Sequence, residues 1–83
     1  MSLKSVDDKH FYLDDRLIDL VWIERHANEL VNAANYHEIN RSLNWLKKLA
    51  RRLAAGNSAE NDELQVRRRL SLLGLGWYLE ESQ

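Results

Sequence analysis

Apolar side chains recur every three or four positions along most of the chain, which is the spacing of one face of an α-helix. The pattern is clearest over residues 36–55, where charged and amide side chains fill the remaining face. The apolar stripe of this segment consists of Ile39, Leu43, Leu46, Leu49, Ala50, Leu53 and Ala54. Gly56 follows directly, at a position where glycine commonly ends a helix. We therefore predict a helix over residues 36–55.

A second helical pattern runs over residues 15–34. Its apolar residues share about half of the helix circumference, as expected for a helix with one buried side. Asp14 or Asp15 is suited to be its N-cap. Asn35, with Glu38 three positions later, is suited to cap the next helix. We therefore predict a helical hairpin that turns at Asn35, with one continuous helix as the alternative.

A third helix is predicted over residues 59–73, although its apolar residues fall on two opposite sides. Gly74 and Gly76 lie inside the apolar run that follows, and each glycine costs about 1 kcal/mol in a helix relative to alanine. The conformation after Leu73 is therefore left open. At the other end, residues 1–13 either extend the first helix or are flexible.

These patterns predict an all-α fold. The 83-residue chain has no proline and no alternating run of β-branched and aromatic residues, so strand signals are weak. We expect a single domain in which a helical hairpin and a third helix form a small three-helix bundle. A chain of this length has a small core, and it has no cysteine that could add a disulfide. We therefore expect homodimerisation to complete the bundle.

Composition and motifs favour a non-catalytic protein. A core of this size leaves little room for a substrate pocket of about 300–1,000 Å³. No two of the three histidines are three or four positions apart, the spacing that metal sites on helices commonly use, so we expect neither a metal nor another cofactor. No apolar run approaches the ~18 residues that a membrane span needs, and none follows a basic start as in a secretory signal. We expect a soluble, cytoplasmic protein that is not an enzyme.

The chain carries more apolar side chains than one stripe per helix requires. Ile18 and Trp22 lie four positions apart and away from the centre of the stripe of their predicted helix. Together with leucines near the C-terminus they form the predicted protein interface: Ile18, Trp22, Leu72, Leu75 and Leu79. Exposed apolar patches with tryptophan anchors are typical of protein interfaces. The sequence thus predicts an adaptor or regulatory subunit that binds a protein partner, unless the three tryptophans share one enlarged core.

Charged residues are segregated along the chain, although the net charge is only −1. Residues 1–40 hold eight acids and four bases, whereas residues 41–69 hold eight bases and three acids. The bases gathered on the predicted second helix are Arg41, Lys47, Lys48, Arg51 and Arg52. Arg67, Arg68 and Arg69 follow, but consecutive helical positions point in different directions.

The basic face of the second helix has two explanations. Several phosphate contacts would make it a salt-dependent nucleic-acid interface, and nucleic-acid binding is therefore the alternative function. An ordinary solvated face, or one that meets the acids of the first helix, explains the same pattern without a nucleic acid. With a protein partner, the acidic and basic regions would select its orientation.

Overall fold

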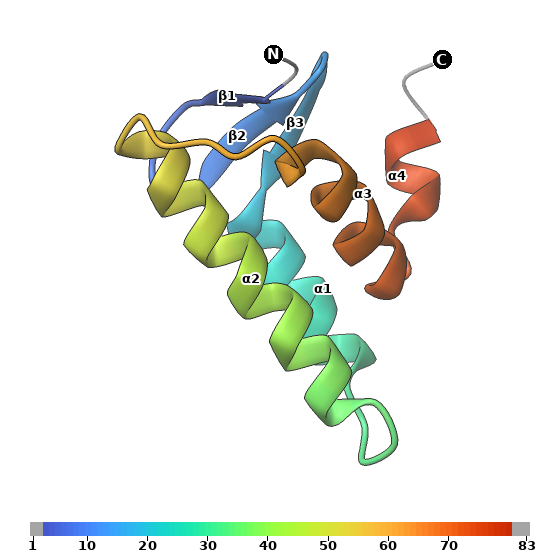
Figure 1. Cartoon of the computed structure of the whole chain (residues 1–83). Helices are drawn as coiled ribbons and strands as arrows, with labels where there is room; N and C mark the ends of the chain where they lie inside the picture. Colours follow the sequence, from blue (N-terminus) through green and yellow to red (C-terminus); the bar gives the residue numbers. More distant parts are fainter. Residues whose placement is uncertain (1–2, 81–83) are drawn as a thin grey trace.

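A computed structural model describes residues 3–80, with side chains for residues 3–78, and has an α+β fold (Figure 1). Three strands form an antiparallel sheet in the order β1-β2-β3: β1 Leu3–Ser5, β2 His10–Leu13 and β3 Arg16–Asp19. Four helices follow within the described residues: α1 Leu20–Leu30, α2 Tyr36–Ala54, α3 Asp62–Leu72 and α4 Gly76–Glu80. The predicted all-α fold, a three-helix bundle, is therefore wrong.

The sheet has one buried and one exposed face. Phe11 and Ile18 are cross-strand partners, and both are fully buried (0% exposed). Tyr12 and Leu17, the adjacent pair, lie on the outer face and are 38% and 37% exposed. This alternation is the period of two of a half-buried antiparallel sheet. Residues 3–19 therefore belong to strands and their turns. The first helix does not begin at residue 15 as predicted, and residues 3–13 neither extend that helix nor form a flexible segment.

The connection between β2 and β3 is a two-residue turn formed by Asp14 and Asp15. Asp14 has a φ of 54°, a left-handed conformation that aspartate tolerates because its short side chain can hydrogen-bond locally. The two aspartates predicted to cap a helix thus form a hairpin turn. The N-cap of α1 is Asp19, whose Oδ1 accepts hydrogen bonds from the backbone N–H groups of Val21 (3.0 Å) and Trp22 (3.3 Å).

α1 and α2 are separate helices joined by a turn, so the alternative of one continuous helix does not hold. Asn35 precedes α2, but its Oδ1 accepts a hydrogen bond from the N–H of Asn32 (2.6 Å) and does not cap the helix. The bounds of α2, Tyr36–Ala54, lie within the segment predicted from the periodicity. Gly56, with a φ of 86°, follows the helix end as the sequence suggested.

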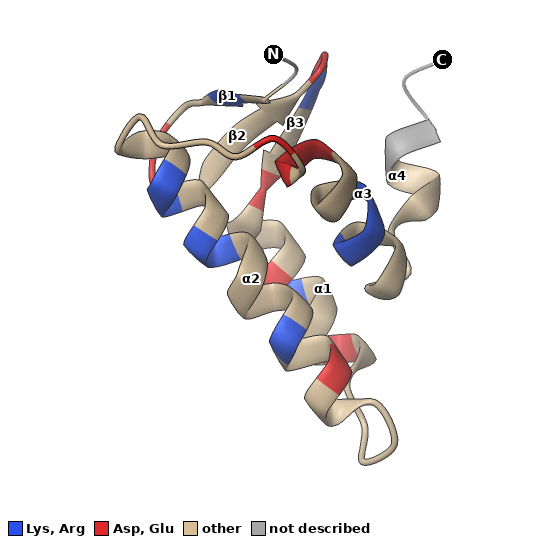
Figure 2. Ribbon diagram, viewed as in Figure 1, with Lys and Arg blue, Asp and Glu red and all other residues tan. Residues whose placement is uncertain are grey.

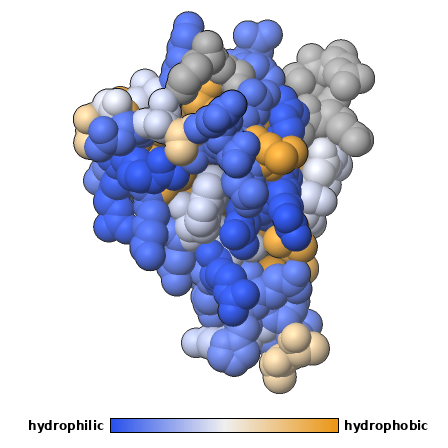
Figure 3. Space-filling view, viewed as in Figure 1, coloured by the Kyte–Doolittle hydropathy of each residue, from blue (hydrophilic) through white to orange (hydrophobic). Residues whose placement is uncertain are grey.

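α2 is the central element of the fold. It contacts α1, α3, β1 and β2, and Figure 1 shows the sheet beside its C-terminal half, with the α1–α2 turn at the opposite end. The largest fully buried apolar side chains are Phe11, Leu13, Ile18, Ile23, Leu46, Leu49, Val66, Leu70, Leu73 and Leu75. They come from the sheet, from α1, α2 and α3, and from the segment that follows α3. Their burial drives folding by about 25 cal/mol per Å² of apolar surface. The face of the molecule shown in Figure 3 is mostly hydrophilic, with small, separate apolar patches.

The C-terminal segment buries leucines on both sides of a glycine turn. α3 ends at Leu72, and Gly74 adopts a φ of 74°. Leu73 and Leu75, on either side of that glycine, are both fully buried (0% exposed). The apolar residues that were predicted on two opposite sides of one helix therefore belong partly to α3 and partly to the turn that leads into α4. None of the helices in the described part of the chain is long and apolar enough to cross a membrane.

Candidate functional site

The residues of the predicted protein interface do not share one surface. Ile18 and Leu75 are fully buried in the core (0% exposed), whereas Trp22 and Leu72 are 41% and 39% exposed. Trp22 contacts α4, and Leu72 lines a groove between α2 and α3. Leu79 lies outside the residues whose side chains are described. Two of the five residues, Trp22 and Leu72, are therefore exposed to a partner, and they lie in different places.

Trp22 belongs to a cluster of aromatic side chains centred on Tyr78. The Trp22 ring stacks on that of Tyr78 (centroids 5.7 Å apart, interplanar angle 20°) and on that of His26 (5.6 Å, 13°). Trp77 meets Tyr78 edge-on (5.9 Å, 84°), and the guanidinium carbon of Arg16 lies 5.0 Å from the Tyr78 ring centroid. Such aromatic and cation–π contacts each add roughly 0.5–1.5 kcal/mol to the effect of burial.

Two hydrogen bonds join this cluster to the rest of the fold. The hydroxyl of Tyr78 donates to the carbonyl oxygen of Leu17 (2.5 Å), which ties α4 to β3. Nε2 of His26 lies 3.0 Å from the carbonyl oxygen of Leu73. Because a carbonyl oxygen only accepts, Nε2 is the donor in this hydrogen bond. The rings of α1 and α4 are thus held in a defined arrangement.

Much of this cluster nevertheless remains in contact with solvent. Trp22 and Trp77 are 41% and 52% exposed, and Leu17 is 37% exposed. We call the set Leu17, Trp22, Trp77 and Tyr78 the aromatic surface. Large rings that are exposed but already held in place are suited to binding, because little side-chain freedom is lost when a partner covers them.

Figure 2 shows basic residues along α2. Their contacts divide them into two groups. Arg52 donates two hydrogen bonds to Asp62, and Lys47 forms an ion pair with Glu24 of α1. The other bases are exposed and form no ion pair with any residue that the structure describes: Arg41, Lys48 and Arg51. Three of the five predicted nucleic-acid contacts are thus available, whereas two stabilise the fold.

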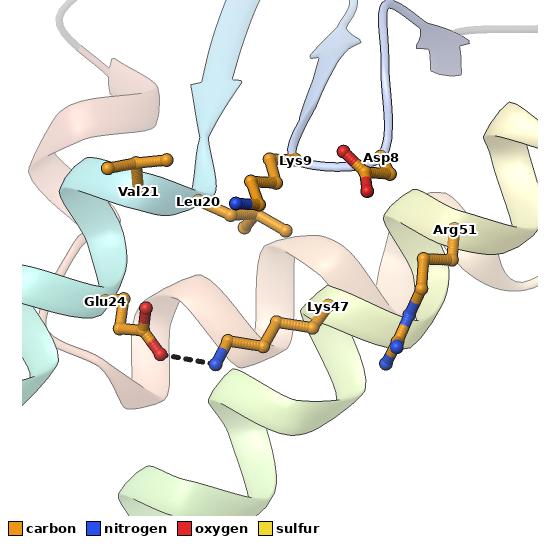
Figure 4. Close-up of a pocket in the computed structure, with 7 residues that line it drawn as sticks. All are labelled: Asp8, Lys9, Leu20, Val21, Glu24, Lys47 and Arg51. Carbon is orange, nitrogen blue, oxygen red and sulfur yellow. Dashed lines mark hydrogen bonds and ion pairs between the residues drawn. The ribbon is translucent and has the colours of Figure 1, made fainter.

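A small cavity lies between the β1–β2 loop, the start of α1 and the middle of α2 (Figure 4). It has a volume of about 340 Å³ and is lined by Asp8, Lys9, Leu20, Val21, Glu24, Lys47 and Arg51. Figure 4 shows the ion pair of Glu24 and Lys47 on one side, with Asp8 and Lys9 across the cavity. The lining contains both acids and bases, so the cavity has no strong excess of positive or negative charge.

A larger groove, with a volume of about 670 Å³, lies between α2 and α3. Its lining includes Arg41 and Ser42 of α2, and Gln65, Arg68 and Arg69 of α3. Of the groove residues, Arg41 and Leu72 were predicted from the sequence, in two different sites, because helical periodicity alone does not show which arginines of α3 face α2. Residues 3–78 contain no cluster of three or more histidine and carboxylate side chains arranged to hold a metal ion.

Asp62 anchors the start of α3. It is almost completely buried (4% exposed), and burial alone would raise the pKa of its carboxyl. Hydrogen bonds from Arg52 and from the backbone N–H of Ala59 (2.7 Å), with the charge of Arg52, outweigh that effect and hold the pKa below its usual 3.8. Asp62 is therefore ionised at neutral pH and links α3 to the C-terminal half of α2.

His10 lies between two carboxylates beside the start of α1. Its Nδ1 is 2.8 Å from Asp7 Oδ1, and its Nε2 is 3.2 Å from Asp19 Oδ1. The hydrogen bond with Asp7 is the main cause of a raised pKa for His10, and the Asp7 and Asp19 charges add to it. The same hydrogen bond lowers the pKa of Asp7. Protonated His10 therefore joins the β1–β2 turn to the N-cap of α1.

Comparison with known proteins adds no relative. No protein-family model matches the chain, and neither the curated proteins nor the solved structures include a match.

Proposed function

We propose that this protein is a small non-catalytic interaction module, an adaptor or regulatory subunit, whose aromatic surface binds a second copy of the chain. The observation that carries the proposal is the exposure of two anchored tryptophans. Trp22 and Trp77 are 41% and 52% exposed, and both rings contact Tyr78. Tryptophan and tyrosine are the residues that most often anchor protein interfaces.

Charges beside the aromatic surface support self-association. Asp15 precedes Arg16, whose guanidinium group lies over Tyr78, and Arg25 lies one helical turn after Trp22. Asp15 and Arg25 are both exposed, and neither forms an ion pair within the described part of the chain. In a two-fold dimer the same patch faces itself, so Asp15 of one copy and Arg25 of the other can attract each other. Such charges select orientation more than they add affinity.

The test is the mass of the protein in solution, measured by light scattering up to high micromolar concentration. We expect the wild type to be a dimer. Trp22→Ala should weaken that dimer at least about 30-fold, since one buried aromatic anchor contributes ~2 kcal/mol and a two-fold dimer loses two. Its circular dichroism should show nearly unchanged helical content, because Trp22 lies outside the core.

Tyr36→Ala is the matched control, since Tyr36 is 55% exposed at the start of α2 and lies outside the aromatic surface. This variant should dimerise like the wild type. A monomeric wild type at the highest concentration, or an equal loss of dimer in both variants, would contradict the proposal.

Nucleic-acid binding is the second candidate, and the three exposed unpaired bases of α2 favour it. These bases are Arg41, Lys48 and Arg51. The proposal predicts that affinity for an oligonucleotide falls steeply between about 50 and 200 mM salt. Lys48→Glu combined with Arg51→Glu should abolish binding, and this pair leaves the structural contact of Arg52 with Asp62 intact. Absence of a gel shift on DNA and RNA at low salt would exclude this candidate.

A further inference from the structure

The groove between α2 and α3 gathers three arginines around one volume of about 670 Å³. Arg41 comes from α2, and Arg68 and Arg69 come from α3. Glu38 is the one carboxylate in the lining, so the groove has a surplus of two positive charges. No ion pair within residues 3–78 involves any of these arginines.

The neighbouring arginine of α3, Arg67, differs from these three because it is paired with carboxylates. Arg67 donates hydrogen bonds to Asp14 (2.8 Å) and Glu63 (3.5 Å). Arg69 has no carboxylate partner among the side chains that the structure describes, and its guanidinium carbon lies 5.6 Å from the ring centroid of Trp45 on α2. This cation–π contact holds Arg69 against α2 and leaves the guanidinium charge unneutralised.

Two buried polar groups in the same lining lack a hydrogen-bond partner within the described part of the chain. Ser42 is fully buried (0% exposed), and its Oγ has no partner. Nε of Arg69 is also buried without a partner. Buried polar groups are nearly always paired, and both of these groups can donate a hydrogen bond. What they lack in common is an acceptor, and both residues line the groove.

We infer that this groove binds a small phosphorylated molecule through its phosphate monoester. Guanidinium groups match phosphate oxygens in geometry and donate two hydrogen bonds at once. A phosphate monoester carries a charge of about −1.5 to −2 at neutral pH, which balances the surplus positive charge of the lining. Its several acceptor oxygens also suit the unpaired donors of Ser42 and Arg69.

The dimensions of the groove favour a small molecule over a polymer. Sites for small ligands usually have volumes of about 300–1,000 Å³, and this groove lies within that range. Leu72, 39% exposed, and Gln65 provide apolar and amide surface for the organic part of the ligand. The groove shares no residue with the aromatic surface, so this inference stands or falls separately from self-association.

The test uses adenosine monophosphate, inorganic phosphate and adenosine as probes of the whole protein. Binding is measured by calorimetry and by the ¹⁵N shift of Arg69 Nε. We expect the nucleotide to bind with a dissociation constant below about 1 mM and to shift the Arg69 signal. Inorganic phosphate should bind more weakly and compete with it, and adenosine should bind at least about tenfold more weakly than the nucleotide.

Three variants separate the groove from general charge effects. Arg68→Gln should weaken nucleotide binding about tenfold or more, whereas Lys4→Gln, which removes an exposed charge of β1, should leave it unchanged. Ser42→Ala should also weaken binding without lowering the stability of the free protein, because it removes a buried group that has no partner. A merely structural role of Ser42 would instead make this variant less stable.

Three outcomes would overturn the inference. The first is that neither the nucleotide nor phosphate shifts Arg69 Nε. The second is that Lys4→Gln weakens binding as much as Arg68→Gln does. The third is that a phosphoserine peptide or an oligonucleotide shifts the Arg69 Nε signal and binds about tenfold more tightly than the nucleotide, which would assign the groove to a macromolecule.

Discussion

The hydroxyl of Tyr78 donates a 2.5 Å hydrogen bond to the backbone carbonyl oxygen of Leu17, a residue 61 positions earlier in the chain. This bond joins α4 to β3, which lies at one edge of the sheet. An edge strand exposes backbone groups that can pair with another chain. Tyr78 covers one of these groups and at the same time positions the ring on which Trp22 stacks. One residue thus protects the sheet edge and builds the aromatic surface.

Tyr78→Phe tests this link. The variant loses the hydroxyl and keeps the ring, so it should lower the free energy of unfolding by about 1 kcal/mol, the usual net contribution of one hydrogen bond. Urea denaturation measures this difference, and amide hydrogen exchange should become faster in α4. Tyr36→Phe is the control, since the hydroxyl of Tyr36 makes no hydrogen bond within the described residues. Equal losses in the two variants would show that the bond to Leu17 contributes nothing.

Asp62→Asn should be strongly destabilising. It weakens the charge-assisted hydrogen bonds from Arg52 (3.0 and 3.2 Å) and Ala59 (2.7 Å), and we expect a loss of about 2–3 kcal/mol at neutral pH. Glu60→Gln removes the same charge from the same segment at an exposed position, and it should be close to neutral. Urea denaturation at neutral pH compares the two variants.

The contribution of Asp62 to the stability of the fold also depends on pH, and it decreases in acid. Its pKa in the folded protein lies below 3.8, the ordinary value that applies to the unfolded chain. The carboxylate therefore adds stability above that ordinary value, and this gain is lost as the pH falls through the lower folded-state pKa. The stability difference between the wild type and Asp62→Asn should shrink in acid. A difference that stays constant from neutral pH down to about pH 3 would contradict this assignment.

His10 should give the opposite pH dependence. Hydrogen bonding to Asp7 raises the pKa of His10 above its ordinary 6.5. The protonated ring therefore adds stability below that value, and the gain is lost as the pH rises through the raised folded-state pKa. Wild type and His10→Gln should differ more at about pH 5.5 than at about pH 8.5. Asp7→Asn should remove much of this difference, and an unchanged pH dependence in Asp7→Asn would contradict the assigned cause.

The sequence predicted α2 closely because its apolar stripe is long, regular and ended by Gly56. It did not predict the sheet, because Leu13, Leu17 and Leu20 are spaced by four and three positions, as on a helix face. In the structure Leu13 points into the core and Leu17 outward, with 2% and 37% exposure. The strands are also short, and β3 passes directly into α1 with no glycine or proline at the junction.

The candidate sites, too, could be predicted only in part from the sequence. Ile18 and Trp22 share a helix face only if both are helical, but Ile18 belongs to β3 and pairs with Phe11 on the buried side of the sheet. Trp22 does lie on a helix and is 41% exposed, and its place in a protein interface stays a prediction. Arg68 and Arg69 could not be assigned to a groove from the sequence, because the way α3 packs against α2 decides which of its side chains lie toward α2.

The turn at Gly74 gives the last prediction. Gly74 has a φ of 74°, and an added Cβ would meet no atom within 4 Å, so alanine there suffers only the strain of the left-handed backbone, about 1–2 kcal/mol. Gly76 also has open space around an added Cβ, but it has no positive φ and begins α4. Gly76→Ala should therefore be neutral or stabilising by up to about 1 kcal/mol.

Thermal denaturation compares the stability of Gly74→Ala and Gly76→Ala, and light scattering compares their self-association through the aromatic surface. The Gly74 turn sets where α4 lies, so it determines whether Trp77 and Tyr78 reach Trp22. Gly74→Ala should therefore weaken self-association as well as stability, whereas Gly76→Ala should leave self-association intact. If Gly74→Ala lowered stability but dimerised like the wild type, the position of α4 would not matter for the dimer, and the aromatic surface would lose its role in self-association.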